Sequence, residues 1–351
     1  MSQTIQVGER LNESEAMQLA SDLQLSETER TVLDFSRTQH FEPFGMLLCI
    51  AAANRLRRRL ENAGTQLVVE PTRIEAGGIA GHMGFWDALG LAVGRRVGSA
   101  GTSGYLPITR LDVGELVRSA VGGDVLAIGE IERRASPMAL VLAVEGVPQL
   151  TEALGYALRE LIRNVVEHAM SPSIWVCGMS WRHRGYLQVA ILDEGRGIRA
   201  SLADNERYRF ADDITARREA LRPGVSRNAG RTMSPARVER IQEQRTGLPP
   251  DIFANSGFGL PMVSRLCRDA GQFLIASGSA ALGIIGGAEI QSATAHRGTA
   301  LRLVLHPADV PGAWERLFSG EGFDLGTTPL LSASKLRRLG LDRLTGGEGK
   351  P

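Results

Sequence analysis

Three polar residues that could take part in chemistry recur every four positions in the segment 158–169, LRELIRNVVEHA. They are Glu160, Asn164 and His168. In a helix with about 3.6 residues per turn, side chains at this spacing fall on one stripe. The apolar residues between them fall on the opposite side, which predicts an amphipathic helix buried on its apolar face. A carboxylate, an amide and an imidazole would then share one polar ridge, which is a weak signal by itself.

Three glycine-containing segments follow this helix along the chain. Segment 193–198 (DEGRGI) comes after a strand-like run, segment 255–260 (NSGFGL) opens a predicted helix, and segment 296–299 (HRGT) enters an alternating strand. With the helix, and in this order, they resemble the four motifs of the GHKL superfamily of ATP-binding domains (gyrase, the heat-shock chaperone, histidine kinases, mismatch-repair ATPases). The resemblance implies a Bergerat fold, an α/β sandwich with helices on one face of a mixed sheet, that binds ATP and Mg²⁺.

The resemblance assigns a role to each residue of the polar ridge. Asn164 matches the family's magnesium ligand, and an amide oxygen suits a hard cation that water and the nucleotide phosphates also coordinate. Glu160 matches the general base that orients and deprotonates a water or hydroxyl attacking the γ-phosphate, with a solvated helix position as the alternative. His168 matches a ribose or phosphate contact, with a packing histidine as an equal alternative.

The resemblance also assigns the adenine contact. Asp193 matches the carboxylate that accepts a hydrogen bond from the adenine amino group and so selects adenine over guanine. Gly195 and Gly197 would let the backbone approach the base closely. Thr299 would support the same adenine contact through a water molecule.

The part of the site that binds the ATP phosphates is predicted around the start of the helix over 260–269. Gly257, Gly259 and Leu260 lie where backbone N–H groups would be exposed at a helix N-terminus, which favours phosphate. The region 199–254 is predicted to be a long ATP lid, with helices over 212–224 and 234–244. Lysine occurs only at positions 335 and 350, so arginine or the metal must contact the phosphates. The candidate arginines are Arg217, Arg218, Arg222, Arg227 and Arg231, among which the sequence makes no choice.

The first part of the chain predicts a smaller α/β unit, because strand-like and helix-like segments alternate there. Its expected elements are a loose start over 1–12, helices over 14–25 and 44–61, strands over 31–35 and 66–70, and a helical turn over 84–89. Residues 30–95 resemble a STAS domain, the fold of anti-sigma-factor antagonists. That family commonly carries Asp-Ser-Ser-Gly with a phosphorylatable serine at the start of its long helix. This chain has FEPFG over 41–45 at the corresponding place and so lacks the serine. An α/β docking domain without phosphorylation is therefore the alternative to a regulated domain.

The predicted organisation is α/β throughout. Strands are expected over 174–176, 187–192, 273–277, 288–292 and 299–305, and a helix in the tail over 333–339. The predicted domains are a STAS-like domain (1–110), a connecting helix (111–134), a GHKL ATP-binding domain (135–308) and a C-terminal tail (309–351).

The composition of the chain argues against several classes of protein. With 40 Lys+Arg against 39 Asp+Glu, the formal net charge of the 351-residue chain is +1, so no global field favours nucleic acid or an acidic membrane. Cys49, Cys177 and Cys267 are far apart and form no CxxC pair, which argues against a zinc site or disulfide framework. The start carries no signal sequence, and no apolar run is long enough to span a bilayer. A cytoplasmic protein is therefore expected.

Two classes of function remain open at this level. The first is enzymatic: a slow ATPase or an anti-sigma-type serine/threonine protein kinase that uses Glu160 as its base. The second is an ATP-sensing switch whose lid orders on the nucleotide and presents a surface to a partner. A histidine kinase is a weaker alternative, because Glu167 stands where many such kinases carry a basic residue. A regulatory protein partner is expected, and a homodimer is left open.

Overall fold

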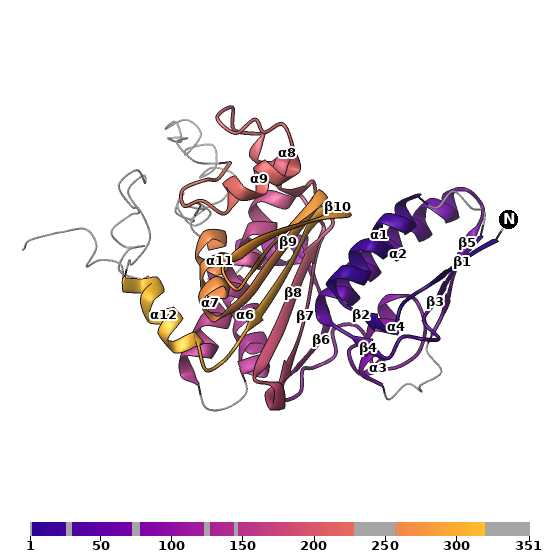
Figure 1. The fold of residues 1–351 in the computed structure, drawn as a ribbon, viewed down its shortest axis with the longest axis horizontal. Helices are drawn as coiled ribbons and strands as arrows, with labels where there is room; N and C mark the ends of the chain where they lie inside the picture. Colours follow the sequence, from indigo (N-terminus) through magenta and orange to yellow (C-terminus); the bar gives the residue numbers. More distant parts are fainter. Residues whose placement is uncertain are drawn as a thin grey trace, which may run out of the picture.

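The computed structural model describes residues 2–25, 30–71, 78–122, 127–143, 147–227, 257 and 259–319. In this part of the chain, the two larger of three β-sheets are separated by the helices α1 (Glu13–Leu25) and α2 (Pro43–Asn62), as Figure 1 shows. The mixed α/β character predicted from the sequence is therefore confirmed. Among the described residues, no helix has both the length and the apolar composition needed to cross a membrane.

The smaller sheet is parallel and is built by the first 70 residues. Its strand order is β1-β3-β5, and α1 and α2 are the two crossover helices. The prediction of a loose start over 1–12 is wrong, because β1 pairs with β3 along its whole length. The predicted helix over 44–61 is confirmed as α2, with proline in its first turn and Gly64 at a left-handed φ of 72° after its end. The strands of this sheet are β1 (Ser2–Gln6), β3 (Arg30–Asp34) and β5 (Gln66–Glu70). The short strands β2 (Arg10–Leu11) and β4 (His40–Phe41) pair in parallel as a separate two-stranded sheet, and two short helices, α3 (Ile79–His82) and α4 (Phe85–Ala88), follow β5.

The larger sheet has five strands in the order β6-β7-β8-β10-β9. All four neighbouring pairs are antiparallel, so the expectation of a mixed sheet is wrong for the strands that the structure describes. The strands predicted over 288–292 and 299–305 are one continuous strand, β10, with irregularities on both sides of His296. The strands are β6 (Tyr105–Asp112), β7 (Ser173–Trp181), β8 (Tyr186–Asp193), β9 (Gly271–Ile285) and β10 (Ala288–Leu305).

A layer of helices covers one face of this larger sheet. The expected connecting helix over 111–134 is not seen as such: the described part of this range holds the end of β6, then α5 and the start of α6, which packs against α7. The expected boundary at residue 110 falls inside β6, which pairs with β7. The helices are α5 (Val113–Gly122), α6 (Ala127–Ala143), α7 (Pro148–Asn164), α8 (Gly197–Leu202), α9 (Asp213–Ala220), α11 (Gly259–Ala270) and α12 (Val310–Ser319).

Alternation along the strands sends side chains into two different cores. On β8, Ile191 belongs to the core formed with α6, α7 and α11, whereas Leu192 belongs to the core formed with α1 and α2. The larger sheet is therefore buried on both faces, and α2 contacts both sheets. This arrangement fixes the direction of every side chain at the end of β8, where the predicted adenine contact lies.

Candidate functional site

Asp193 is the last residue of β8, and its side chain is buried against the α7 side of the sheet. It is 2% exposed and lines a pocket there. Burial raises its pKa to about 6, although hydrogen bonds from Gly195 and Thr299 act in the opposite direction. A buried carboxylate with a raised pKa that lines a pocket is a candidate ligand-binding group.

The turn after Asp193 brings the backbone close to the same carboxylate. The Gly195 backbone N–H donates a hydrogen bond to Asp193 Oδ1 at 2.8 Å. A Cβ at residue 195 would overlap the backbone carbonyl of Ala169, so glycine is required for the turn to pass the end of the preceding helix. Gly197 adopts a left-handed φ of 79° and lines the pocket itself.

The strand β10 contributes the next residues of the site. Thr299 pairs in register with Asp193 and lines the pocket. His296 is 1% exposed, and its Nε2 lies 2.8 Å from the Asp193 backbone oxygen. Burial, followed by the charge of Arg55, lowers the His296 pKa to about 4, so the ring is neutral at physiological pH. Its Nε2 therefore carries the proton and donates to the Asp193 carbonyl.

The polar ridge of α7 is not one regular helical stripe. The α-helix ends at Asn164, and a π-helical segment covers Val165–Ala169. Because a π-turn closes i→i+5 hydrogen bonds, His168 is not one α-turn beyond Asn164, as the even spacing predicted. Asn164 and His168 nevertheless both line the pocket.

His168 lines the pocket as a neutral ring. Burial, followed by the positive charges of Arg227 and Arg163, lowers its pKa to about 3. The predicted contact with phosphate can therefore involve hydrogen bonding only, because the imidazole brings no charge. A ribose hydroxyl is a more suitable ligand for such a neutral group.

These groups surround one pocket, which is partly open to solvent. It lies between α7, the π-helical segment, α8, the start of α11 and the strands β8, β9 and β10. Its walls include apolar side chains such as Leu161, Val165, Ile275 and Leu301, beside few polar groups. Seven residues predicted from the sequence line it: Asn164, His168, Asp193, Gly197, Gly257, Leu260 and Thr299.

Three predicted residues do not line this pocket: Glu160, Gly195 and Gly259. Gly195 acts through its backbone, as described above. Glu160 and Gly259 lie against each other, because a Cβ at residue 259 would overlap Glu160 Oε2. The Glu160 carboxylate thus sits at the first turn of α11, where a negative charge is stabilised by the helix dipole.

Glu160 is also surrounded by guanidinium groups. Its Oε1 lies 3.9 Å from Arg159 Nε and 3.8 Å from an Nη of Arg163, and its side chain is 12% exposed. Arg163 is in turn bound to Glu167 at 2.7 Å. The carboxylate is therefore held in a network of ion pairs one helical turn before Asn164.

The lid arginines differ sharply in position. Arg217 is fully buried and donates to the Ser277 backbone oxygen, whereas Arg218 pairs with Glu289 and Arg222 with Glu219. Of the four candidates that the structure describes, Arg227 lines the pocket and the other three do not. Arg231 and the predicted helix over 234–244 lie outside the described residues, as does the predicted tail helix over 333–339.

The side chains of the pocket also include a possible ligand for a magnesium ion. Within the described ranges, no group of three or more His, Cys, Asp or Glu residues could hold a metal. A magnesium ion bound together with a nucleotide would have the Asn164 amide oxygen in the pocket wall as a protein ligand. That pattern suits Mg²⁺, which commonly takes few protein ligands in nucleotide sites.

Sequence reasoning missed several residues of the site. Ser277 Oγ accepts a hydrogen bond from the Ile198 backbone N–H at 3.1 Å and so ties the glycine turn to β9. Ser226 lines the pocket beside Arg227. The sequence places His296 in a motif without indicating its role. The position of His296 two residues before Gly298, within the HRGT motif, is a sequence signal that could have identified it as a site residue. In the structure this part of β10 is irregular.

Searches against protein-family models, curated proteins and solved structures found no match to this chain. The function of the pocket is therefore inferred from its residues and their geometry.

Proposed function

We propose that the pocket binds ATP with Mg²⁺ and that the chain is a regulatory protein of the GHKL type. The observation that carries this proposal is the convergence of four segments, distant in the sequence, on one pocket. Asn164, Asp193, Gly257 and Thr299 each come from a different one of these segments. A chance occurrence of four short motifs gives no reason for their residues to meet around one pocket.

The adenine would lie against the apolar walls with its amino group toward Asp193. The carboxylate is buried, and the Gly195 N–H and Thr299 fix its orientation. Adenine presents an amino donor at this position, whereas guanine presents a carbonyl acceptor. A buried carboxylate would therefore reject guanine, because two acceptors would face each other without a proton between them.

The phosphates would lie toward the start of α11, near Gly257 and Leu260. Arg227 lines the same pocket, and a helix N-terminus supplies backbone N–H groups that favour anions. Arg227 would then take the place of a phosphate-binding lysine, since guanidinium binds phosphate through parallel hydrogen bonds. Asn164 would hold the magnesium ion that shields the phosphate charge.

We favour an enzyme that turns ATP over slowly, as an ATPase or a protein kinase with Glu160 as general base. The position of Glu160 beside Gly259, where the terminal phosphate is proposed to lie, supports this role. A non-catalytic ATP switch is the second candidate. The observation in its favour is that Glu160 is paired with Arg159 and Arg163 and does not line the pocket.

The proposal is tested by comparing ATP and GTP at equal magnesium concentration in calorimetric titrations of the full chain. We expect ATP to bind and GTP to bind at least about 100-fold more weakly, because a buried acceptor would be left facing another acceptor. Equal affinities for the two nucleotides would exclude the adenine contact. No binding of either nucleotide would exclude the proposed function.

A further inference from the structure

A second pocket lies on the other side of the end of β8, next to α2. It has about 770 Å³ of empty space, open to solvent, and most of its lining is charged. The lining carries an excess of three positive charges over its single carboxylate. The residues are Arg55, Arg58, Arg59, Asn62, Glu194 and Arg297.

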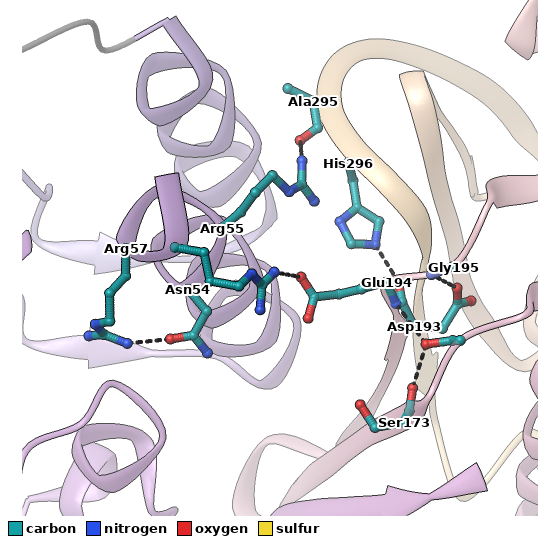
Figure 2. A network of polar contacts seen from close by, with 11 residues as sticks. Asn54, Arg55, Arg57, Ser173, Asp193, Glu194, Gly195, Ala295 and His296 are labelled. Carbon is teal, nitrogen blue, oxygen red and sulfur yellow. Dashed lines mark hydrogen bonds and ion pairs between the residues drawn. The ribbon is translucent and has the colours of Figure 1, made fainter. Parts of the chain in front are cut away.

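Helical and strand periodicity together build this cluster. Arg55, Arg58, Arg59 and Asn62 follow the i, i+3, i+4, i+7 spacing that places side chains on one face of α2. Alternation along β8 sends Asp193 toward α7 and the next residue, Glu194, toward α2. Figure 2 shows Glu194 extending toward the arginines of α2, away from Gly195 and the Asp193 carboxylate.

The positive charge of this cluster is not balanced among the described residues. Glu194 Oε1 binds Arg58 Nη2 at 3.0 Å and is the single carboxylate in the lining. Arg297 is exposed, and no ion pair neutralises it within the described ranges. Arg59 donates hydrogen bonds to the carbonyls of Leu23 and Gln24 at the end of α1, which orient its guanidinium group.

The guanidinium group of Arg55 has a buried nitrogen without a hydrogen-bond partner among the described residues. Its Nη1 reaches the Ala295 carbonyl at 3.4 Å, while its buried Nη2 has no hydrogen-bond partner in the described structure. Burial lowers the pKa of Arg55, Glu194 raises it, and the neighbouring charges of Arg58 and Arg297 lower it further. A buried donor without an acceptor costs free energy, and Arg55 lines the pocket in which the anion would lie.

We propose that this arginine cluster is a binding site for a small phosphate-type anion carrying two or more negative charges. It is separate from the nucleotide pocket, with which it shares no lining residue. Guanidinium groups suit this ligand because their planar N–H donors match pairs of phosphate oxygens. An anion with at least two charges is favoured, since Arg55, Arg58 and Arg297 each bring a guanidinium group to the lining.

The test is calorimetric titration of the full chain with pyrophosphate, without nucleotide or magnesium and at constant ionic strength. The double variant Arg58→Gln/Arg297→Gln should bind pyrophosphate at least about tenfold more weakly than wild type, because two charge-assisted contacts are removed. Arg297→Gln alone changes an exposed residue and should also weaken binding, so the test does not depend on the folding of the double variant. Glu194→Gln should strengthen binding, since it removes the carboxylate that repels the anion.

Two control variants show whether pyrophosphate binds at the arginine cluster itself. Arg184→Gln removes an exposed arginine at the turn between β7 and β8 and should leave pyrophosphate binding unchanged, which excludes a mere effect of net charge. Arg227→Gln removes the arginine that lines the nucleotide pocket and should also leave pyrophosphate binding unchanged. Wild-type affinity in Arg297→Gln and in the folded double variant, or no binding of pyrophosphate by wild type, would overturn the proposal.

Discussion

Asp193 and Thr299 are directly paired across β8 and β10, and Thr299 hydrogen-bonds the Asp193 carboxylate through both its backbone and its hydroxyl. Two residues more than 100 positions apart in the sequence thus form one buried polar unit at the edge of a pocket. The carboxylate is oriented from the strand side and remains available from the pocket side. An acceptor for the adenine amino group has to meet both of these conditions.

The Asn164 amide is predicted to bind the magnesium ion of a bound nucleotide. Asn164→Ala should weaken ATP binding far more in the presence of magnesium than in its absence, because the metal-free nucleotide does not use the amide. Titrations of wild type and variant with ATP, with magnesium or with a chelator, measure the difference. An equal loss under both conditions would make Asn164 a packing residue of the pocket wall.

Glu160 is predicted to affect turnover and not affinity. A general base contributes about 10²–10⁴-fold to rate and little to ground-state binding, so Glu160→Ala should abolish slow phosphate release while ATP affinity stays within a few-fold. Phosphate release and calorimetry provide the two readouts. Glu152→Ala, an exposed residue on the same helix, is the matched control and should alter neither.

The outcome for Glu160 distinguishes the two function classes. Unchanged turnover in Glu160→Ala would remove this residue from the mechanism. If the wild-type protein binds ATP but releases no phosphate, with or without a candidate protein substrate, the ATP switch is the correct class.

Gly298 is predicted to be essential for the approach of β10 to Asp193. A Cβ at residue 298 would overlap the Asp193 backbone oxygen and lie 2.8 Å from Asp193 Oδ1. Gly298→Ala should therefore lower the free energy of unfolding by about 1–3 kcal/mol, as overpacking does in other cores. Gly155→Ala is the control: its Cβ would come no closer than 4.0 Å to Ala139, in a helix that gains about 0.5–1 kcal/mol from alanine. Urea denaturation of both variants should give opposite signs, and equal destabilisation would contradict the predicted overlap.

His296 is predicted to make the fold sensitive to acid. Its folded pKa of about 4 lies below the ordinary value of 6.5, so the unfolded chain takes up a proton first as the pH falls. The stability that the neutral ring contributes is present above pH 6.5 and is lost as the pH falls toward 4. Relative to His296→Gln, wild type should lose up to about 3 kcal/mol of unfolding free energy across this window.

The measurement for His296 is urea denaturation at several pH values between about 7 and 4, with His183→Gln as an exposed control. The control should follow the wild-type pH dependence throughout. A constant difference between wild type and His296→Gln over the whole range would show that the buried ring does not titrate as its environment implies.

Local patterns in the sequence predicted many elements but not their partners. Apolar periodicity and the glycine at position 64 predicted α2, and alternation predicted β8, because these signals act within one segment. The pairing of β6 with β7 and of β1 with β3 joins distant segments, which no local signal encodes. The antiparallel arrangement of the larger sheet was missed for the same reason.

In the candidate site, too, local sequence signals predicted some features, whereas features that depend on tertiary packing were missed. The glycine motifs predicted a pocket around Asp193 because only small residues tolerate such close backbone contacts, as at Gly195. The π-helical segment before Met170 has no signal in residue types, so the spacing of His168 was misjudged. Tertiary packing alone separates the buried Arg217 from Arg227 at the pocket, since both belong to the same arginine-rich stretch.

Asp193 is predicted to accept a hydrogen bond from the adenine amino group of ATP, and a calorimetric comparison of wild type with Asp193→Asn measures this contact. Wild type and Asp193→Asn are titrated with ATP and magnesium at about pH 8, where the Asp193 carboxylate, with a pKa of about 6, is ionised. We predict that the variant binds ATP more weakly by about 2–3 kcal/mol, because a hydrogen bond to a charged acceptor is lost. Equal affinities of folded wild type and variant would contradict the account.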